Sequence, residues 1–218
     1  DYRAMFGTVA KWVTEIEAAD RIPEILQRAW TTATSGRPGP VVIALPEDML
    51  RQQTSAPALT APARVEEPAP SAQVMKDVRM MLGAAKRPLV LFGGCDWSDA
   101  GREALQGFAV ASDMPVVATF RYQDRFDNHL PVYAGDAGVG MQPATKELIR
   151  NADVLLAINT RFGENTTDGY GLLNVPVPAQ KLIHVHSSAM EIGKVYQPQL
   201  GIVAGPNAFA AALAEAPV

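Results

Sequence analysis

The sequence predicts an α/β fold: a doubly wound, mainly parallel Rossmann-like sheet with helices on both faces, preceded by a helix-strand remnant of another α/β domain. Two observations support this prediction. From residue 71 onward, short apolar runs alternate with amphipathic segments, which is typical of a sheet whose strands are joined by helices. An earlier apolar run, VVIAL at 41–45, is separated from the later ones by a segment rich in Pro and Ala.

The first part of the chain reads as a helix followed by a strand. Apolar residues recur at helical spacing from Ile22 to Ala33, after Asp20 as a cap and before Gly36 as a stop. The unbroken apolar run that follows suits a strand covered on both faces, as in a parallel sheet. Such a strand needs parallel neighbours, and we expect no earlier strand in residues 1–39 to supply one.

Residues 51–70 have no apolar period and are expected to form a semi-extended linker. The segment 71–218 then alternates between strand and helix patterns. The expected helices are 71–85, 99–112, 143–152 and 207–216, and the expected strands are 87–94, 114–120, 153–159, 181–186 and 200–205.

Composition and charge exclude several classes of partner. The net charge of −4 comes without a basic stripe, so nucleic acid is not an expected partner. No apolar run approaches the roughly 20 residues that cross a bilayer, so no membrane partner is expected. The single cysteine, Cys95, cannot form an internal disulfide or a zinc-binding cluster, which fits a cytoplasmic protein. Because residue 1 is Asp1, we interpret the chain as processed or cut from a longer protein.

Ligands of doubly wound sheets bind at the carboxyl ends of the strands. Four such ends, 93–97, 119–123, 159–169 and 186–194, are rich in Gly, Thr, Asn, Ser and Arg, residues that can bind a polyphosphate. The Gly93–Gly94 pair suits either close approach of a ligand or a sharp exit from a buried strand. Arg161 could hold an anion or pair with a carboxylate such as Glu164 or Asp168.

The histidines and the cysteine are weaker candidates. We expect His184 and His186 to point to opposite faces of their strand, with His184 buried and His186 nearer a ligand. Cys95 is interpreted as a small buried hydrophobic residue rather than a reactive thiol. The GDAGVG segment at 135–140 looks like a phosphate or metal loop, but Asn159 falls at a different strand end, so a metal site is not favoured.

Several segments together resemble one family. GRPGPVVIALPEDML, residues 36–50, resembles the end of the pyrimidine-binding domain of thiamine-diphosphate-dependent enzymes of the acetolactate synthase, benzoylformate decarboxylase and oxalyl-CoA decarboxylase type. AAKRPLVLFGG, MPVVATF, AGDAGVG, NADVLLAINTRF and KLIHVHSSAMEIGK resemble the central domain of these enzymes, in the same order. The resemblance implies that 1–50 is the C-terminal remnant of the pyrimidine-binding domain, 51–70 a linker and 71–218 the central Rossmann-like domain.

The resemblance also implies a function. The parent enzyme would be a lyase or transferase that acts on 2-keto acids or related acyl substrates with thiamine diphosphate and Mg²⁺. Its catalytic glutamate and its diphosphate and metal motif would lie in the missing pyrimidine- and diphosphate-binding domains of the same polypeptide. The chain itself would have no catalytic residue and no metal ligand, and would support the catalytic domains in a homo-oligomer.

An alternative is that the strand ends bind a nucleotide, FAD or ADP, as the central domain does in some relatives. Gly93, Gly94, Arg161 and Phe162 match the contact positions in those relatives, and Thr119 and His186 complete the candidate nucleotide site. The chain departs from the nucleotide-binding pattern at His186, where an acidic residue is usual, and at Pro206. A third interpretation, a free-standing nicotinamide-dependent enzyme, is disfavoured because the glycine fingerprint is missing.

Overall fold

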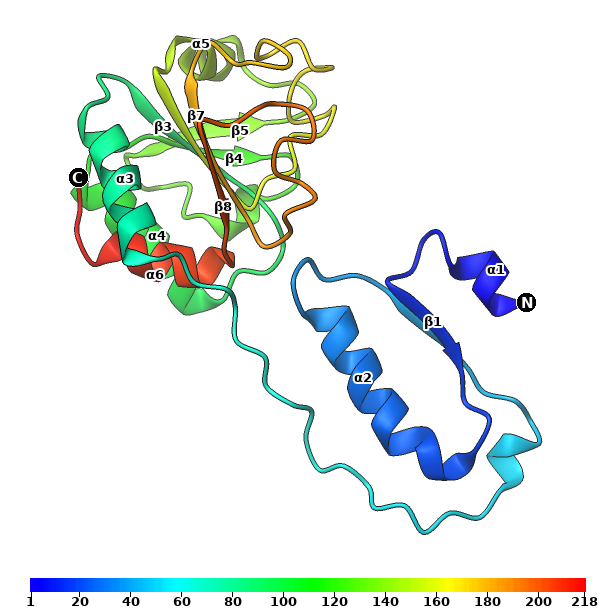
Figure 1. The fold of residues 1–218 in the computed structure, drawn as a ribbon. Coiled ribbons are helices and arrows are strands. Elements are labelled where there is room, and N and C mark those ends of the chain that lie inside the picture. The colour runs from blue at the N-terminus through cyan, green and yellow to red at the C-terminus, as the bar shows by residue number, and fades with distance from the viewer. The chain divides into compact units, whose positions relative to one another are not determined.

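The computed structural model describes residues 1–218, which divide into two compact units, 1–66 and 67–218 (Figure 1). None of the helices in either unit is both long and apolar enough to cross a bilayer.

The first unit contains a small parallel sheet. Helix α1 (Tyr2–Phe6) precedes strand β1 (Trp12–Glu15), and helix α2 (Ile22–Thr34) leads to strand β2 (Val41–Ala44). Strand β1 pairs with β2 in parallel, with Trp12 opposite Val41. The expectation that residues 1–39 hold no strand was therefore wrong. Only Thr14 of β1 is buried, so the strand lacks the apolar run that marks β2.

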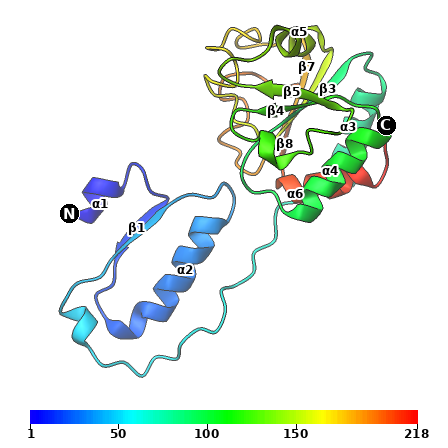
Figure 2. The same cartoon turned by 180° about the vertical axis from the view of Figure 1, so that it is seen from behind.

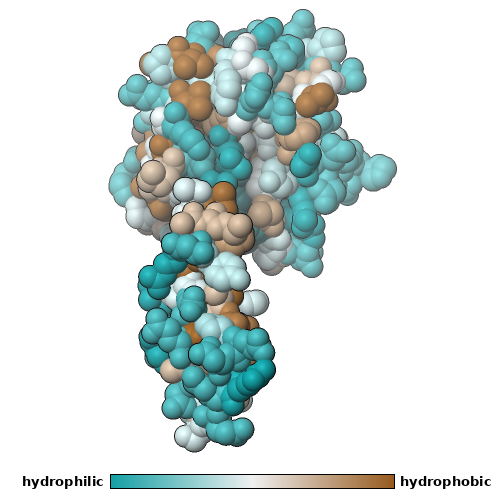
Figure 3. All heavy atoms as spheres, turned by 90° about the vertical axis from the view of Figure 1, so that its right-hand side faces the viewer, coloured by the Kyte–Doolittle hydropathy of each residue, from teal (hydrophilic) through white to brown (hydrophobic).

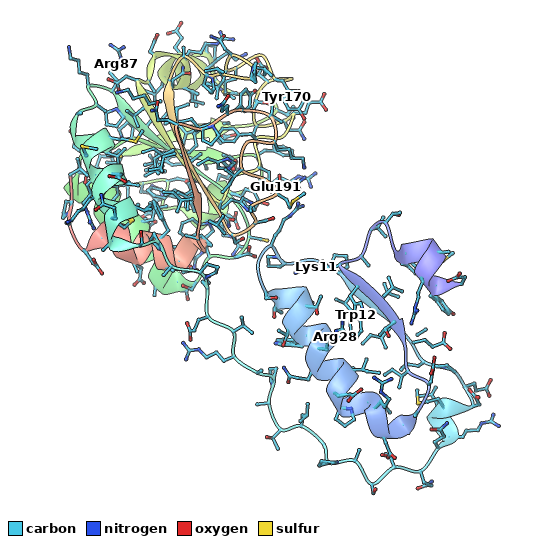
Figure 4. All side chains as sticks on the ribbon, viewed as in Figure 1. Lys11, Trp12, Arg28, Arg87, Tyr170 and Glu191 are labelled. Carbon is cyan, nitrogen blue, oxygen red and sulfur yellow. The ribbon has the colours of Figure 1, made fainter.

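The core of this unit is small: its buried apolar residues include Ile16, Ile25 and Met49. Polar contacts join the residue before β1 to the loop between α2 and β2. The ammonium group of Lys11 donates to the carbonyl oxygens of Ser35 at 2.7 Å and Arg37 at 3.1 Å. The guanidinium carbon of Arg28 on α2 lies 4.3 Å from the ring centroid of Trp12 on β1, a cation–π contact (Figure 4). The first unit is thus held together by a small core and by these contacts at its surface.

The second unit is built on a sheet of parallel strands in the order β5-β4-β3-β6-β7-β8. The chain runs outward from β3 to β5, returns to the centre at β6, and runs outward again to β8, which is the doubly wound arrangement. The strands are β3 (Pro88–Phe92), β4 (Val116–Thr119), β5 (Tyr133–Ala137), β6 (Val154–Ile158), β7 (Lys181–His186) and β8 (Leu200–Val203). The predicted fold class is confirmed.

Helices cover both faces of this sheet (Figures 1 and 2). Helices α3 (Ala72–Gly83), α4 (Asp99–Ala111) and α6 (Pro206–Ala214) pack on one face, and α5 (Pro143–Asn151) packs on the other. Alternate residues of each central strand enter the two cores: Val90 and Phe92 face the three helices, whereas Leu89 and Leu91 face α5.

One strand of this sheet was not expected. Residues 135–137 of the GDAGVG segment lie in edge strand β5, with Asp136 opposite Ala118, and not in a glycine loop. Gly and Asp are disfavoured in strands, so the sequence of β5 carries no strand pattern. Hydrogen bonding to β4 therefore stabilises the extended conformation that these residues do not favour by themselves.

Most large apolar side chains of the second unit are buried, and Figure 3 shows apolar residues scattered among polar ones on one face of the molecule. The first unit is different, because Leu26 and Trp30 on α2 are each at least half exposed, at 50% and 55%. They line an open groove of about 540 Å³ between α2 and residues 54–62. The apolar surface of α2 is therefore only partly covered within its own unit.

Candidate functional site

The candidate site lies where the strand order reverses, at the carboxyl ends of β3 and β6. These strands are neighbours in register, with Phe92 opposite Ile158. The backbone NH of Gly93 donates to the carbonyl oxygen of Ile158 at 3.0 Å, so pairing continues one residue beyond β3. In doubly wound sheets this is the position where ligands bind.

The two glycines allow strand ends to touch one another. A Cβ on Gly93 would lie 2.2 Å from Oγ1 of Thr119, at the end of β4. Gly94 has a φ of 80°, and a Cβ there would lie 2.1 Å from Nδ2 of Asn159, at the end of β6. The space in front of both glycines is filled by protein side chains, so close packing explains the pair. This favours the sharp exit from the strand over an open phosphate cradle.

Asn159 and Phe162 hold the turn after β6 in a left-handed conformation, with φ values of 55° and 48°. Such angles are uncommon outside glycine and concentrate at functional or tightly constrained positions. The Phe162 ring is buried, with its centroid 5.1 Å from that of His184 and 5.4 Å from that of Tyr196. Phe162 therefore belongs to the core beneath the turn.

Arg161 projects from the same turn, and its side chain is 58% exposed. Its Nε atom lies 4.0 Å from Oε1 of Glu191, whose side chain is only 3% exposed. Neither expected partner is used: Asp168 pairs instead with Lys146, at 2.5 Å. The correct carboxylate is about thirty residues downstream of Arg161, in the loop after β7, which is why local spacing did not identify it.

Glu191 belongs to the site, although the sequence patterns did not predict it. Its carboxylate also lies 3.5 Å from Nζ of Lys194, so one buried anion faces two cations (Figure 4 labels Glu191). Buried carboxylates are rare unless they are paired. The only sequence signal was an acidic residue three positions before a lysine in a loop that follows a buried strand.

The two histidines of β7 were expected on opposite faces, which is wrong. Residues two apart in a strand share a face, and the ring centroids of His184 and His186 are 6.2 Å apart. Nε2 of His184 lies 2.9 Å from the carbonyl oxygen of Thr160, and burial lowers the pKa of His184. Nδ1 of His186 accepts from the backbone NH of Ser188 at 2.9 Å. Both rings are buried, so His186 is less accessible than expected.

Cys95 was expected to be buried, but it is exposed. Its thiol donates to Oδ1 of Asp96 at 3.2 Å. Partial burial and this neighbouring carboxylate raise the pKa of the Cys95 thiol. A thiol with a raised pKa is a weak nucleophile at neutral pH.

Of the six residues in the expected nucleotide site, the structure brings Gly93 against Thr119, and it places Gly94 against Asn159. Arg161 stands out among the six because its side chain is charged and largely exposed. Thr119, Phe162 and His186 are buried. Several buried polar atoms nearby have no hydrogen-bond partner in the protein, among them Nδ2 of Asn159, Oγ of Ser187 and Nδ1 of His184.

The sequence of this chain is similar to proteins of one family. Residues 75–213 match the family model for the thiamine pyrophosphate enzyme, central domain. The chain is 32% identical over 193 residues to acetolactate synthase 1 of Zea mays, a match that covers 85% of the chain and 29% of the relative. It is 28% identical over 198 residues to the acetolactate synthase isozyme 2 large subunit of Escherichia coli, covering 91% of the chain and 35% of the relative.

A third relative extends the match through the first unit. The acetolactate synthase large subunit of Corynebacterium glutamicum is 28% identical over 218 residues, which is 99% of the chain and 34% of the relative. The chain thus spans about a third of the length of the relatives that it matches.

Proposed function

Since the chain belongs to the thiamine pyrophosphate enzymes and contains their central domain, we propose that it is part of an acetolactate synthase-like lyase or transferase that joins or cleaves 2-keto acids. The observation that carries this proposal is the match of nearly the whole chain, first unit included, to an acetolactate synthase large subunit. In this proposal, residues 1–50 are the end of the pyrimidine-binding domain, 51–70 are a linker, and 71–218 are the central domain.

The role proposed for this chain is support rather than catalysis. The residues that look most like a diphosphate and metal motif do not meet: Asp136 lies in β5 and Asn159 follows β6, and strands β4 and β3 lie between them. The strand ends are stabilised instead by contacts within the protein, such as Gly94 against Asn159. We therefore assign no reaction step to residues 1–218. The cofactor would be held by the pyrimidine- and diphosphate-binding domains of the same polypeptide, in a cytoplasmic homo-oligomer.

The test is product formation by the intact protein that contains this chain. With pyruvate, thiamine diphosphate and Mg²⁺, we expect acetolactate as the main product. Benzoylformate and oxalyl-CoA, offered separately, distinguish the other two enzyme types that the sequence resembles. The proposal would be overturned if the intact protein converted none of these three compounds.

A second candidate function is binding of FAD or ADP at the strand ends. It rests on Arg161, an exposed cation at the switch point, and is less favoured because the chain matches thiamine enzymes and protein side chains fill the space at Gly93 and Gly94. Thr119, Phe162 and His186 are buried and would support the site from below, and Gly93 and Gly94 could offer a ligand only their backbone groups.

Calorimetric titration of the chain with FAD and, separately, with ADP tests this second function. Saturable heat that disappears in Arg161→Ala is the expected result. Arg64→Ala is the matched control, because Arg64 is an exposed arginine of the first unit that pairs only with nearby Glu66, at 2.7 Å. Absence of heat in the folded protein, or equal loss in both variants, would contradict it.

A further inference from the structure

The first residue of the second unit, Glu67, is bound to the start of the last helix. Its Oε2 accepts from the backbone NH groups of Asn207 and Ala208, both at 3.1 Å, and its Oε1 accepts from Nδ2 of Asn207. Helix α6 has no capping side chain of its own at Gly205. A carboxylate from a distant part of the chain therefore satisfies the free NH groups at the positive end of the helix.

The backbone is shaped for this contact. The carbonyl oxygen of Pro68 accepts from the NH of Gly205 at 2.8 Å. A Cβ on Gly205 would lie 2.2 Å from Oε2 of Glu67, so only glycine lets the carboxylate approach so closely. The end of the linker is thus fitted to α6 by hydrogen bonds and by shape.

Asn207 continues the contact to a second loop. Its Oδ1 accepts from the backbone NH of Ser98 at 2.8 Å and from the Ser98 hydroxyl at 3.0 Å, and its Nδ2 donates to the carbonyl oxygen of Asp96 at 2.8 Å. Ser98 is the N-cap of α4, where its hydroxyl accepts from the NH of Gly101 at 3.0 Å. One amide side chain therefore joins Glu67 to the loop between β3 and α4.

The opposite end of α6 is held by the same incoming segment. Arg79 on α3 donates to the carbonyl oxygen of Ala212 in the last turn of α6, at 2.6 Å. An anion at the first turn and a cation at the last turn both match the helix dipole. Glu67 and Arg79 thus each bind one end of α6 with a side chain whose charge is opposite to that end of the helix dipole.

We propose that Glu67 and Asn207 form a latch that fixes the end of the linker on the central domain and couples it to the β3–α4 loop. With the latch closed, the chain is ordered from Glu67 onward, and Asn207 is oriented to hold Asp96 and Ser98. When Glu67 is withdrawn, Asn207 loses the carboxylate that orients its amide group, and its hydrogen bonds to the loop beside Gly93 and Gly94 weaken. This latch is independent of the reaction proposed above and of nucleotide binding.

Residue-resolved amide hydrogen exchange tests the latch in the 218-residue chain. In Glu67→Ala, the amides of Asn207 and Ala208 are expected to exchange at least about tenfold faster, because they lose their acceptor. The Ser98 amide should also exchange faster, because its acceptor, Oδ1 of Asn207, is no longer held in place by Glu67. Glu67→Gln, which keeps one acceptor oxygen, should give a smaller increase at the same amides. Glu66→Gln is the matched control: Glu66 is adjacent and exposed, pairs with Arg64, and should change none of them.

The amides of β6 report whether the sheet is intact. If Glu67→Ala also speeds amide exchange in β6, the whole unit has been destabilised. The milder Glu67→Gln variant, in which exchange in β6 should be unchanged, then tests the latch. Unchanged exchange at Asn207 and Ala208 would overturn the latch. Faster exchange at Asn207 and Ala208 with unchanged exchange at Ser98 would overturn the coupling to the loop.

Discussion

Gly94 shows how one residue can be required by geometry without contacting a ligand. Its positive φ disfavours any side chain, and a Cβ at this position would lie only 2.1 Å from Nδ2 of Asn159. Gly94→Ala should lower the free energy of unfolding by about 2 kcal/mol, the sum of backbone strain and a displaced Asn159. Urea unfolding measures this change.

Gly163 is the matched control for Gly94. It lies in the neighbouring turn, and a Cβ there would meet no atom within 4 Å. Gly163→Ala should leave the unfolding midpoint close to that of the native chain. Equal destabilisation by both substitutions would contradict the packing explanation.

His184 makes stability depend on pH. Burial lowers its pKa in the folded state, while in the unfolded state the pKa returns to about 6.5. Below that value the unfolded chain binds a proton that the folded chain excludes, so His184 should reduce stability progressively as the pH falls from about 6.5. Above about pH 7 it should contribute no pH dependence, because the imidazole is neutral in both states.

The His184→Gln variant isolates this effect, since glutamine does not titrate and can donate to the carbonyl of Thr160. Between about pH 7 and pH 5, the native chain should lose more stability than the variant. An NMR titration of the His184 ring should place its midpoint below about 6.5. A midpoint above that value would contradict the burial argument.

At the scale of elements, helix α4 offers two glycines with opposite surroundings. A Cβ on Gly101 would lie 2.1 Å from Oδ1 of Asn207, whereas a Cβ on Gly107 would meet nothing within 4 Å. Gly107→Ala should raise stability by roughly 0.5–1 kcal/mol, because alanine loses less backbone entropy in a helix. Gly101→Ala should lower stability, because the added methyl group displaces Asn207.

Thermal unfolding of the two variants, compared with the native chain, gives the sign of each change. Opposite shifts in the melting temperature support the described packing of α4 against Asn207. A gain in stability for Gly101→Ala would show that α4 and α6 do not approach as closely as described.

The elements that sequence patterns predicted are those whose local pattern agrees with their environment. Strand β6 is wholly buried and reads as an unbroken apolar run, and α3 begins at the Ser71 cap and shows a helical period. Strand β5 contains Gly135 and Asp136, so tertiary pairing formed it against weak local preference. Strand β1 consists mainly of residues that favour strands, but it has only four residues and one buried side chain, so it shows no apolar run. For the site, the strand ends were predictable from topology. The Arg161–Glu191 pair was not, because it depends on how two long loops fold together.

At the scale of the whole molecule, the two units differ in how much core they hold. The second unit has two extensive cores on opposite faces of its sheet, whereas the first unit has a single small one. Units of fewer than about 70 residues rarely bury enough apolar surface to be stable by themselves. Residues 67–218 should therefore fold independently, and residues 1–66 should not.

Expression of the fragment 67–218 tests this expectation. Its melting temperature should match the main transition of the whole chain. Amide exchange in the whole chain should be fast across β1 and β2 and slow across β6. A fragment that fails to fold, or protection in β1 equal to that in β6, would contradict this division of stability.

We propose that this chain supports a thiamine-dependent enzyme without holding its cofactor. A calorimetric titration of the purified, folded chain with thiamine diphosphate in the presence of Mg²⁺ tests it most directly. We expect no saturable heat, because the cofactor is proposed to bind in the neighbouring domains, and Asp136 and Asn159 are held apart by strands β4 and β3. Saturable binding with a stoichiometry near one would contradict it and would place the cofactor site within this chain.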